Sequence, residues 1–283
     1  MKRLLVLLAT VATVAGLAAC AAPAPAGLPA GITVEAFQNR LDYGARILEL
    51  KVTNGTSDLF TVTSATFESN RFAEPAAWTR STEIPDGSAR DLKVQLPAPI
   101  CDDAAPKATV RIDFVLPDGT VGSGSLVPSD PNDQLAKINS DDCLLVAAEK
   151  HASITAADTL QWTPGTKSPA TLDIVLDPTD AQGTLTVTGA RDTILFSLVA
   201  DDGSALTLQD LHVVIDADSP ETVIHLRLQP NRCDPHAVAE DKRGTFFPLY
   251  FETSEGASGA YSVPVTPEVK AALYSYIASW CAA

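Results

Sequence analysis

Most of the chain alternates hydrophobic and polar residues with a period of two, which is typical of β-strands buried on one face. Leu48, Leu50 and Val52 alternate with polar residues, and residues 110–116 and 224–228 repeat the pattern. These runs are short and are bounded by turn-forming segments such as TNGTSD and LPDGT. Short strands rich in threonine and valine favour antiparallel sandwiches over an α/β fold. We therefore predict an all-β protein.

Helical periodicity is clearest at the C-terminus. In the segment TPEVKAALYSYIASWC, apolar residues recur at helical spacing after Pro267. We expect an amphipathic helix there, held at its end by Cys281.

The chain also contains an internal repeat. Residues 91–102 and 222–234 share alternating apolar positions, a proline and a terminal Cys-Asp. Each is preceded by a strand, a polar turn and a second strand, and is followed by a strand ending in Val-Pro, a proline-led helix and a cysteine. The repeat predicts two tandem immunoglobulin-like β-sandwich domains, residues 31–146 and 147–283, each followed by a short helix.

The N-terminus predicts export and a lipid anchor. A basic start precedes an uncharged apolar run over residues 4–19, too short for a comfortable membrane span, so residues 1–19 are interpreted as a signal peptide. The run closes with Leu-Ala-Ala-Cys, which looks like a bacterial lipobox with Cys20 as the lipidated residue. Plain secretion with a coincidental cysteine is the alternative. Residues 20–30, rich in Ala and Pro, are expected to be a flexible tether.

Four cysteines remain after Cys20: Cys101, Cys143, Cys233 and Cys281. An even number outside the cytoplasm favours two disulfides, and four cysteines allow three pairings. The repeat aligns the first with the third and the second with the fourth. Because two copies of one unit should close the same local bond, we predict the disulfides Cys101–Cys143 and Cys233–Cys281.

The charge balance excludes one class of partner. The chain has 20 basic and 35 acidic residues, a net charge of -15. Removal of residues 1–19 takes away two basic residues, which leaves 18 against 35 and a net charge of -17. Such a surface repels nucleic-acid phosphates and anionic lipid headgroups. We therefore expect no nucleic-acid partner, and contact with the bilayer through the acyl anchor alone.

The residues closest to site chemistry lie in NRCDPHAVAEDKRG, residues 231–244. Asp234 followed by proline predicts a capped helix start, and Gly244 is expected to end the helix in a left-handed conformation. His236 and Glu240 are four residues apart and form half of a candidate metal site. A site needs three or four ligands, and the first copy offers no matching histidine. We expect a capped, exposed helix, with a metal site or partner recognition as alternatives.

Other motifs give no catalytic residue and no cofactor. The patterns G-x-S-x-G, S-x-x-K and H-E-x-x-H do not occur. GSGSL at Gly122 and GASGAY at Gly256 are expected at hairpin turns. His225 is expected on the outward side of its strand, and His151 and His212 have no paired ligand nearby in the sequence.

The lipobox, the Ala/Pro tether and two Ig-like units, each with Pro-x-x-Cys-Asp after a strand, resemble cell-envelope lipoproteins of high-GC Gram-positive bacteria. The resemblance implies a fold and a location, the extracytoplasmic face of the cell membrane, and brings no catalytic residues. We expect a non-catalytic binding or scaffolding module that meets another envelope protein. The alternatives are an envelope hydrolase or metal-dependent enzyme using His236, Glu240 and Asp241, and a carrier of a small ligand or ion.

Overall fold

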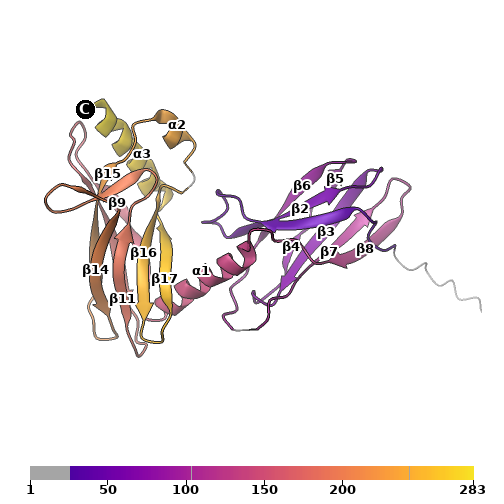
Figure 1. Ribbon diagram of the computed structural model, residues 1–283, viewed down its shortest axis with the longest axis horizontal. Helices are drawn as coiled ribbons and strands as arrows, with labels where there is room; N and C mark the ends of the chain where they lie inside the picture. The colour runs from indigo at the N-terminus through magenta and orange to yellow at the C-terminus, as the bar shows by residue number, and fades with distance from the viewer. Residues whose placement is uncertain (1–25, 103, 242) are drawn as a thin grey trace, which may run out of the picture.

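The computed structural model describes residues 26–102, 104–241 and 243–283. The predicted signal peptide (residues 1–19) and Cys20 lie outside these ranges. Within them, no helix combines the length and the apolar character needed to span a bilayer. The buried apolar side chains form two separate clusters, one enclosed by strands β1–β8 and one by strands β9–β17. We call these two parts the N-terminal unit and the C-terminal unit (Figure 1).

The N-terminal unit is a sandwich of two antiparallel sheets. Alternation places residues such as Leu50 and Phe114 inside, where both are fully buried. One sheet has the order β1 (Ile32–Phe37), β2 (Ile47–Asn54), β6 (Ala89–Gln95); the other has the order β4 (Ala76–Trp78), β3 (Phe60–Ser69), β7 (Ala108–Val115), β8 (Val121–Leu126), with β5 (Thr82–Ile84) also paired to β3.

The C-terminal unit repeats this arrangement, adds β12 and β13, and has no counterpart of β5. One sheet has the order β13 (Ala205–Leu206), β12 (Phe196–Val199), β15 (Thr222–Pro230), β10 (Ala170–Pro178), β9 (Ala152–Gln161); the other has the order β14 (Leu208–Ile215), β11 (Leu185–Arg191), β16 (Phe246–Thr253), β17 (Ser258–Pro264). The order β9-β10-β15 corresponds to β1-β2-β6, and β14-β11-β16-β17 corresponds to β4-β3-β7-β8. The repeat seen in the sequence is therefore also a repeat of strand order.

The predicted C-terminal helix is present as α3 (Pro267–Ala282). The Thr266 hydroxyl caps its start by accepting a hydrogen bond from the Val269 amide, and Leu273 and Tyr276 lie in the core. The Tyr276 hydroxyl is within 3.0 Å of the Leu228 carbonyl oxygen, and burial raises the pKa of this tyrosine to about 12. The apolar face of α3 is thus fixed to its own unit.

The two disulfides are the two local bonds that the repeat predicts. Cys101, after β6, is bonded to Cys143 in α1 (Gln134–Glu149), and Cys233, after β15, is bonded to Cys281 in α3. Each bond therefore attaches the helix at the end of a copy to the segment after the corresponding strand.

Helix α1 differs from α3 because it contacts both units (Figure 1). Leu135 and Ile138 belong to the N-terminal core, whereas Ala148 belongs to the C-terminal core. The helix continues to residue 149, past residue 146, the predicted end of the first domain. One continuous helix therefore connects the two cores.

Two expectations are corrected at β8. The last residues of the predicted flexible tether, residues 20–30, are docked: Ala26 bridges to Gly122, and the Ser123 amide donates to the Ala26 carbonyl oxygen at 2.9 Å. Gly122 lies inside a strand and not at the expected turn. A Cβ at this position would lie 2.6 Å from the Ala26 carbonyl oxygen and would also overlap the Phe114 ring. This glycine is needed for the close approach of the N-terminal segment. Gly256, in contrast, lies at a turn with a φ of 94°, as expected.

Candidate functional site

The most prominent concave feature is where the two units meet. Two neighbouring cavities, of about 310 Å³ and about 640 Å³, share Arg243, Phe246 and Ser262 in their walls. The smaller lies against α1 and the segment before β2, residues 38–46. The larger lies against the end of β11, residues 240 and 241, and residues 243–248. We call the two together the inter-unit cleft.

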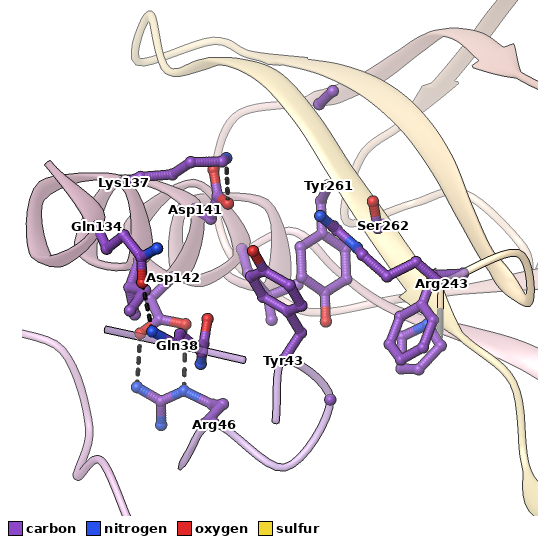
Figure 2. A pocket seen from close by; sticks show the side chains of 16 residues that line it. Gln38, Tyr43, Arg46, Gln134, Lys137, Asp141, Asp142, Arg243, Tyr261 and Ser262 are labelled. Atoms are coloured by element: carbon purple, nitrogen blue, oxygen red, sulfur yellow. Dashed lines mark hydrogen bonds and ion pairs between the residues drawn. The ribbon is translucent and has the colours of Figure 1, made fainter. Parts of the chain in front are cut away.

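Arg46 fixes the segment 38–46 against α1. Its Nη2 and Nε atoms donate to the two carboxylate oxygens of Asp142 at 2.6 Å and 3.1 Å, as Figure 2 shows, and Nη2 also donates to the Pro97 carbonyl oxygen at 2.8 Å. The backbone of Arg46 has a φ of 51°, in the left-handed region that side chains other than glycine rarely adopt. The side-chain contacts hold the residue in this conformation. The Gln38 amide adds a hydrogen bond to the Gln134 side chain at the start of the helix.

A buried charged cluster supports the same segment from behind. The side chains of Asp42 and Glu49 are almost fully buried, and the Lys93 ammonium group lies 3.1 Å from Asp42 and 2.8 Å from Glu49. Burial raises the pKa of Glu49, while the hydrogen bonds to Glu49 and Asp42 raise the pKa of Lys93. One lysine thus compensates two buried carboxyl groups beneath the cleft.

The tip of the segment 38–46 touches the C-terminal unit directly. The Arg243 guanidinium carbon lies 4.3 Å from the centroid of the Tyr43 ring, which is a cation–π geometry. A Cβ on Gly44 would lie 3.0 Å from the Phe246 ring, so glycine allows the two units to approach closely here. Both contacts join segments that are about 200 positions apart in the chain.

Tyr261 of β17 forms the opposite wall of the smaller cavity. Figure 2 shows Tyr43 and Tyr261 in the space between α1 and Arg243. Burial raises the pKa of Tyr261, and the nearby carboxylates of Glu149 and Asp142 raise it further. Its hydroxyl group therefore stays protonated over an even wider pH range than an ordinary tyrosine and can donate a hydrogen bond to a ligand.

The larger cavity has a mixed lining. Four arginines converge on it from three separate segments of the chain, three acidic residues stand among them, and apolar side chains form the remaining wall. The arginines are Arg40, Arg191, Arg232 and Arg243; the acidic residues are Asp192, Glu240 and Asp241; the apolar wall includes Ile194, Leu195, Phe246 and Pro248. The cleft therefore offers charged, aromatic and aliphatic surface together.

The segment 231–244 contains the predicted capped helix, α2 (Pro235–Ala239). The Asp234 carboxylate accepts from the His236 amide at 3.0 Å, as expected for an N-cap. The prediction for Gly244 was wrong, because its φ is not in the left-handed region. A Cβ at this position would instead lie 2.5 Å from Leu195 Cγ and 2.7 Å from an Asp241 carboxylate oxygen. Close packing, and not a helix stop, requires glycine here.

The two metal candidates are not brought together with further ligands. His236 is exposed on α2, and Glu240 lies at the wall of the larger cavity. Across the ranges that the structure describes, no group of three or more His, Cys, Asp and Glu residues is placed to hold a metal ion. His225 is exposed, as expected, and its Nδ1 lies 2.7 Å from Asp173.

One histidine contact was not predicted from the sequence. The His151 ring is buried, and its Nε2 lies 2.8 Å from the Glu255 carboxylate, which also accepts from Lys150 at 2.7 Å. The hydrogen bonds from Lys150 and His151 lower the pKa of Glu255 to about 2. The cluster ties the end of α1 to the turn before β17. Partners more than 100 residues apart leave no local signal in the sequence.

Comparison with known proteins adds similarities of low identity only. No family model and no curated protein sequence matches the chain. Among solved structures, a transglutaminase of red sea bream is similar over 84% of this chain and 32% of its own, with 10% identity and a TM-score of 0.23. Two domains of a biofilm associated protein are also similar at 10% identity: the B domain over 82% of this chain and 85% of its own, with a TM-score of 0.23, and the BSP domain over 87% and 61%, with a TM-score of 0.26. The chain thus spans about a third of the transglutaminase, and at these TM-scores no activity is transferred from any of the three.

Proposed function

We propose that the protein is a non-catalytic binding module at the extracytoplasmic face of the cell membrane, and that it binds at the inter-unit cleft. The observation that carries the proposal is the construction of the cleft from both units. Clefts between domains are common ligand sites because each wall is held by its own rigid core. Here the walls are fixed further by the Arg46–Asp142 pair and by one helix shared between the cores.

The strand order supports the Ig-like part of the proposal. In both units, three strands that include the first two of the unit form part of one sheet. This sheet faces a set of four strands that includes the last two strands of the unit. This division is that of immunoglobulin-like sandwiches, in which binding surfaces are carried by loops and by contacts between domains. The cleft consists of such loops together with one face of α1 and residues of β16 and β17.

A lipid on Cys20 would leave the cleft accessible. Ala26 pairs with β8, which lies on the side of the N-terminal unit away from the C-terminal unit (Figure 1). Six residue steps separate Cys20 from Ala26, a reach of roughly 20 Å at most. The anchor would hold the N-terminal unit beside the bilayer and place the cleft beyond it.

A small-ligand carrier is the second candidate, and the size of the larger cavity favours it. A volume of about 640 Å³ falls within the range of small-molecule sites. A carrier would hold its ligand through purification. Native mass spectrometry of the intact protein would then show an added mass that disappears on denaturation, whereas a module that binds only another protein would show none.

Photo-crosslinking in cells tests the main proposal. A photoreactive amino acid at Ser262, which lines both cavities, is compared with the same amino acid at Asp91, which is exposed on β6 away from the cleft. We expect a discrete adduct with an envelope protein from Ser262 only, lost when Cys20→Ser removes the anchor. Equal adducts from both positions, or none from Ser262 together with no ligand mass, would contradict binding at the cleft.

A further inference from the structure

The larger cavity concentrates arginine in a chain that is strongly acidic. The sequence has eleven arginines and a net charge of -15, yet four arginines line this one cavity. Arg40 precedes β2, Arg191 ends β11, Arg232 follows β15 and Arg243 follows α2. Their convergence arises from the fold and not from a basic run in the sequence.

These arginines are left without close carboxylate partners. Within the described ranges, no carboxylate oxygen lies within 4.0 Å of Arg40, Arg232 or Arg243, and the nearest for Arg191 is that of Asp192, at 3.9 Å. Three of the six other arginines in the described ranges, Arg46, Arg111 and Arg227, pair with Asp142, Asp113 and Asp201. The guanidinium groups at the cavity therefore keep donors free for a ligand.

The acidic residues in the wall do not neutralise this set. Asp241 is used within the C-terminal unit, since one carboxylate oxygen accepts from the Gly244 amide at 2.6 Å and the other from the Tyr274 hydroxyl at 2.9 Å. Because both donors are neutral, Asp241 keeps its negative charge, and the wall holds three carboxylates against four arginines. The local charge is therefore positive, opposite to the charge of the whole chain.

Apolar surface lies beside the arginines. Ile194 is 61% exposed, which is unusual for an isoleucine, and the partly exposed Phe246 and Pro248 continue the same wall. Arginine forks match the geometry of phosphate and carboxylate groups in a bidentate manner, and exposed apolar side chains favour a ligand with a hydrophobic part. A ligand with both features would use the whole cavity.

We propose that the arginine-lined half of the inter-unit cleft binds a small ligand that carries phosphate or carboxylate groups on an apolar or aromatic body. This proposal rests on the proposed function, because it takes the same cleft as the binding site. The guanidinium groups of Arg40 and Arg232 hold the anionic group, Arg243 is positioned by stacking on Tyr43, and Ile194 contacts the apolar body.

Calorimetric titration with inorganic pyrophosphate and with phenyl phosphate tests the site at low ionic strength. The full chain carries Cys20→Ser, so that no lipid contributes. We expect both probes to bind, and Arg232→Gln and Arg40→Gln each to weaken binding by about tenfold, the effect of losing a charge-assisted hydrogen bond. The control Arg90→Gln removes the same charge from an exposed position on β6 and should leave binding within about twofold. Phenyl phosphate should lose affinity in Ile194→Ser, whereas pyrophosphate should not.

Absence of binding by both probes, or equal weakening by Arg90→Gln, would overturn the proposal. An adduct from Ser262 in cells without binding of either probe would leave the cleft as a protein-binding site and reject only the ligand class. A further assay asks whether the anionic group belongs to a lipid headgroup or to a free ligand. The protein is sedimented with vesicles of phosphatidylglycerol and, as a control, with vesicles of phosphatidylcholine. Sedimentation that is lost in Arg232→Gln assigns a lipid headgroup, and binding of pyrophosphate without sedimentation assigns a free ligand.

Discussion

Replacement of Arg46 tests how the segment 38–46, one wall of the cleft, is held in place. This residue joins the segment 38–46 to α1 through Asp142 and the Pro97 carbonyl oxygen, and its backbone lies in the left-handed region. Two substitutions separate these properties. Arg46→Ala removes the side-chain contacts and keeps the cost of a positive φ, whereas Arg46→Gly removes the same contacts and relieves that cost.

The geometry sets the expected magnitudes. Hydrogen bonds to charged groups contribute about 1.5–3 kcal/mol, and the lower part of this range applies because the Arg46 side chain is 34% exposed. Loss of the arginine also leaves the Asp142 carboxylate, only 16% exposed, without its partner. We expect Arg46→Ala to lower the free energy of unfolding by about 2 kcal/mol. A left-handed conformation costs a side chain about 1–2 kcal/mol, and the entropy of glycine in the unfolded chain offsets about half of it, so Arg46→Gly should be about 0.5–1 kcal/mol more stable than Arg46→Ala.

Urea unfolding followed by circular dichroism, with calorimetry to resolve the two units, measures these differences. Arg90→Ala serves as the control, because it removes an exposed arginine and should stay within about 0.5 kcal/mol of the wild type. If Arg46→Ala also stayed within about 0.5 kcal/mol, the ion pair would not secure the segment. If Arg46→Gly were the less stable of the two variants, the assigned backbone strain would be wrong.

Three further predictions concern the anchor, the α2 segment and pH. Cys20→Ser should abolish the acyl anchor, and an unmodified Cys20 in the N-terminal peptide of the wild type, detected by mass spectrometry, would refute lipidation. Asp234→Ala should cost about 1 kcal/mol by removing the cap, whereas His236→Ala should be neutral within about 0.5 kcal/mol; a rise in the unfolding midpoint with zinc, copper or calcium that is lost only in His236→Ala would show a metal site. Because hydrogen bonds lower the pKa of Glu255 to about 2 from 4.5, its contribution to stability is present above pH 4.5 and is lost as the pH falls through 2. The stability difference between the wild type and Glu255→Gln should therefore shrink over that interval, and a difference independent of pH would contradict it.

Local patterns were sufficient to predict the strands, α3 and the two disulfides. The alternation over residues 48–52 places apolar side chains inside, because a period of two matches the geometry of a strand with one buried face. The pairing of Cys101 with Cys143 followed from the repeat, since equivalent positions in two copies of a fold lie in equivalent places. These features depend on residues close in sequence or on a comparison within the chain.

Features that depend on packing between distant segments were not predictable in the same way. Gly122 suggested a turn, yet the residue is in a strand that the N-terminal segment crosses. Gly244 suggested a helix stop, yet Leu195 leaves no room for a side chain there. In both cases the position requires glycine, but the reason is a neighbouring residue that is distant in the sequence and that no local pattern reveals. The convergence of arginines at the cleft is of the same kind.

The cleft arises where the two copies of the repeat differ. Helix α3 packs on its own unit, whereas α1 contacts both cores and so brings the segment 38–46 beside the C-terminal unit. The segment 231–244 contains residues that the first copy lacks, and it supplies Arg232, Glu240, Asp241 and Arg243 to the larger cavity. Duplication alone would reproduce a similar surface on each unit. The shared helix and the inserted segment instead create one asymmetric site, so substitutions in residues 231–244 that face the cleft should alter binding, while those at the Asp234 cap should alter stability.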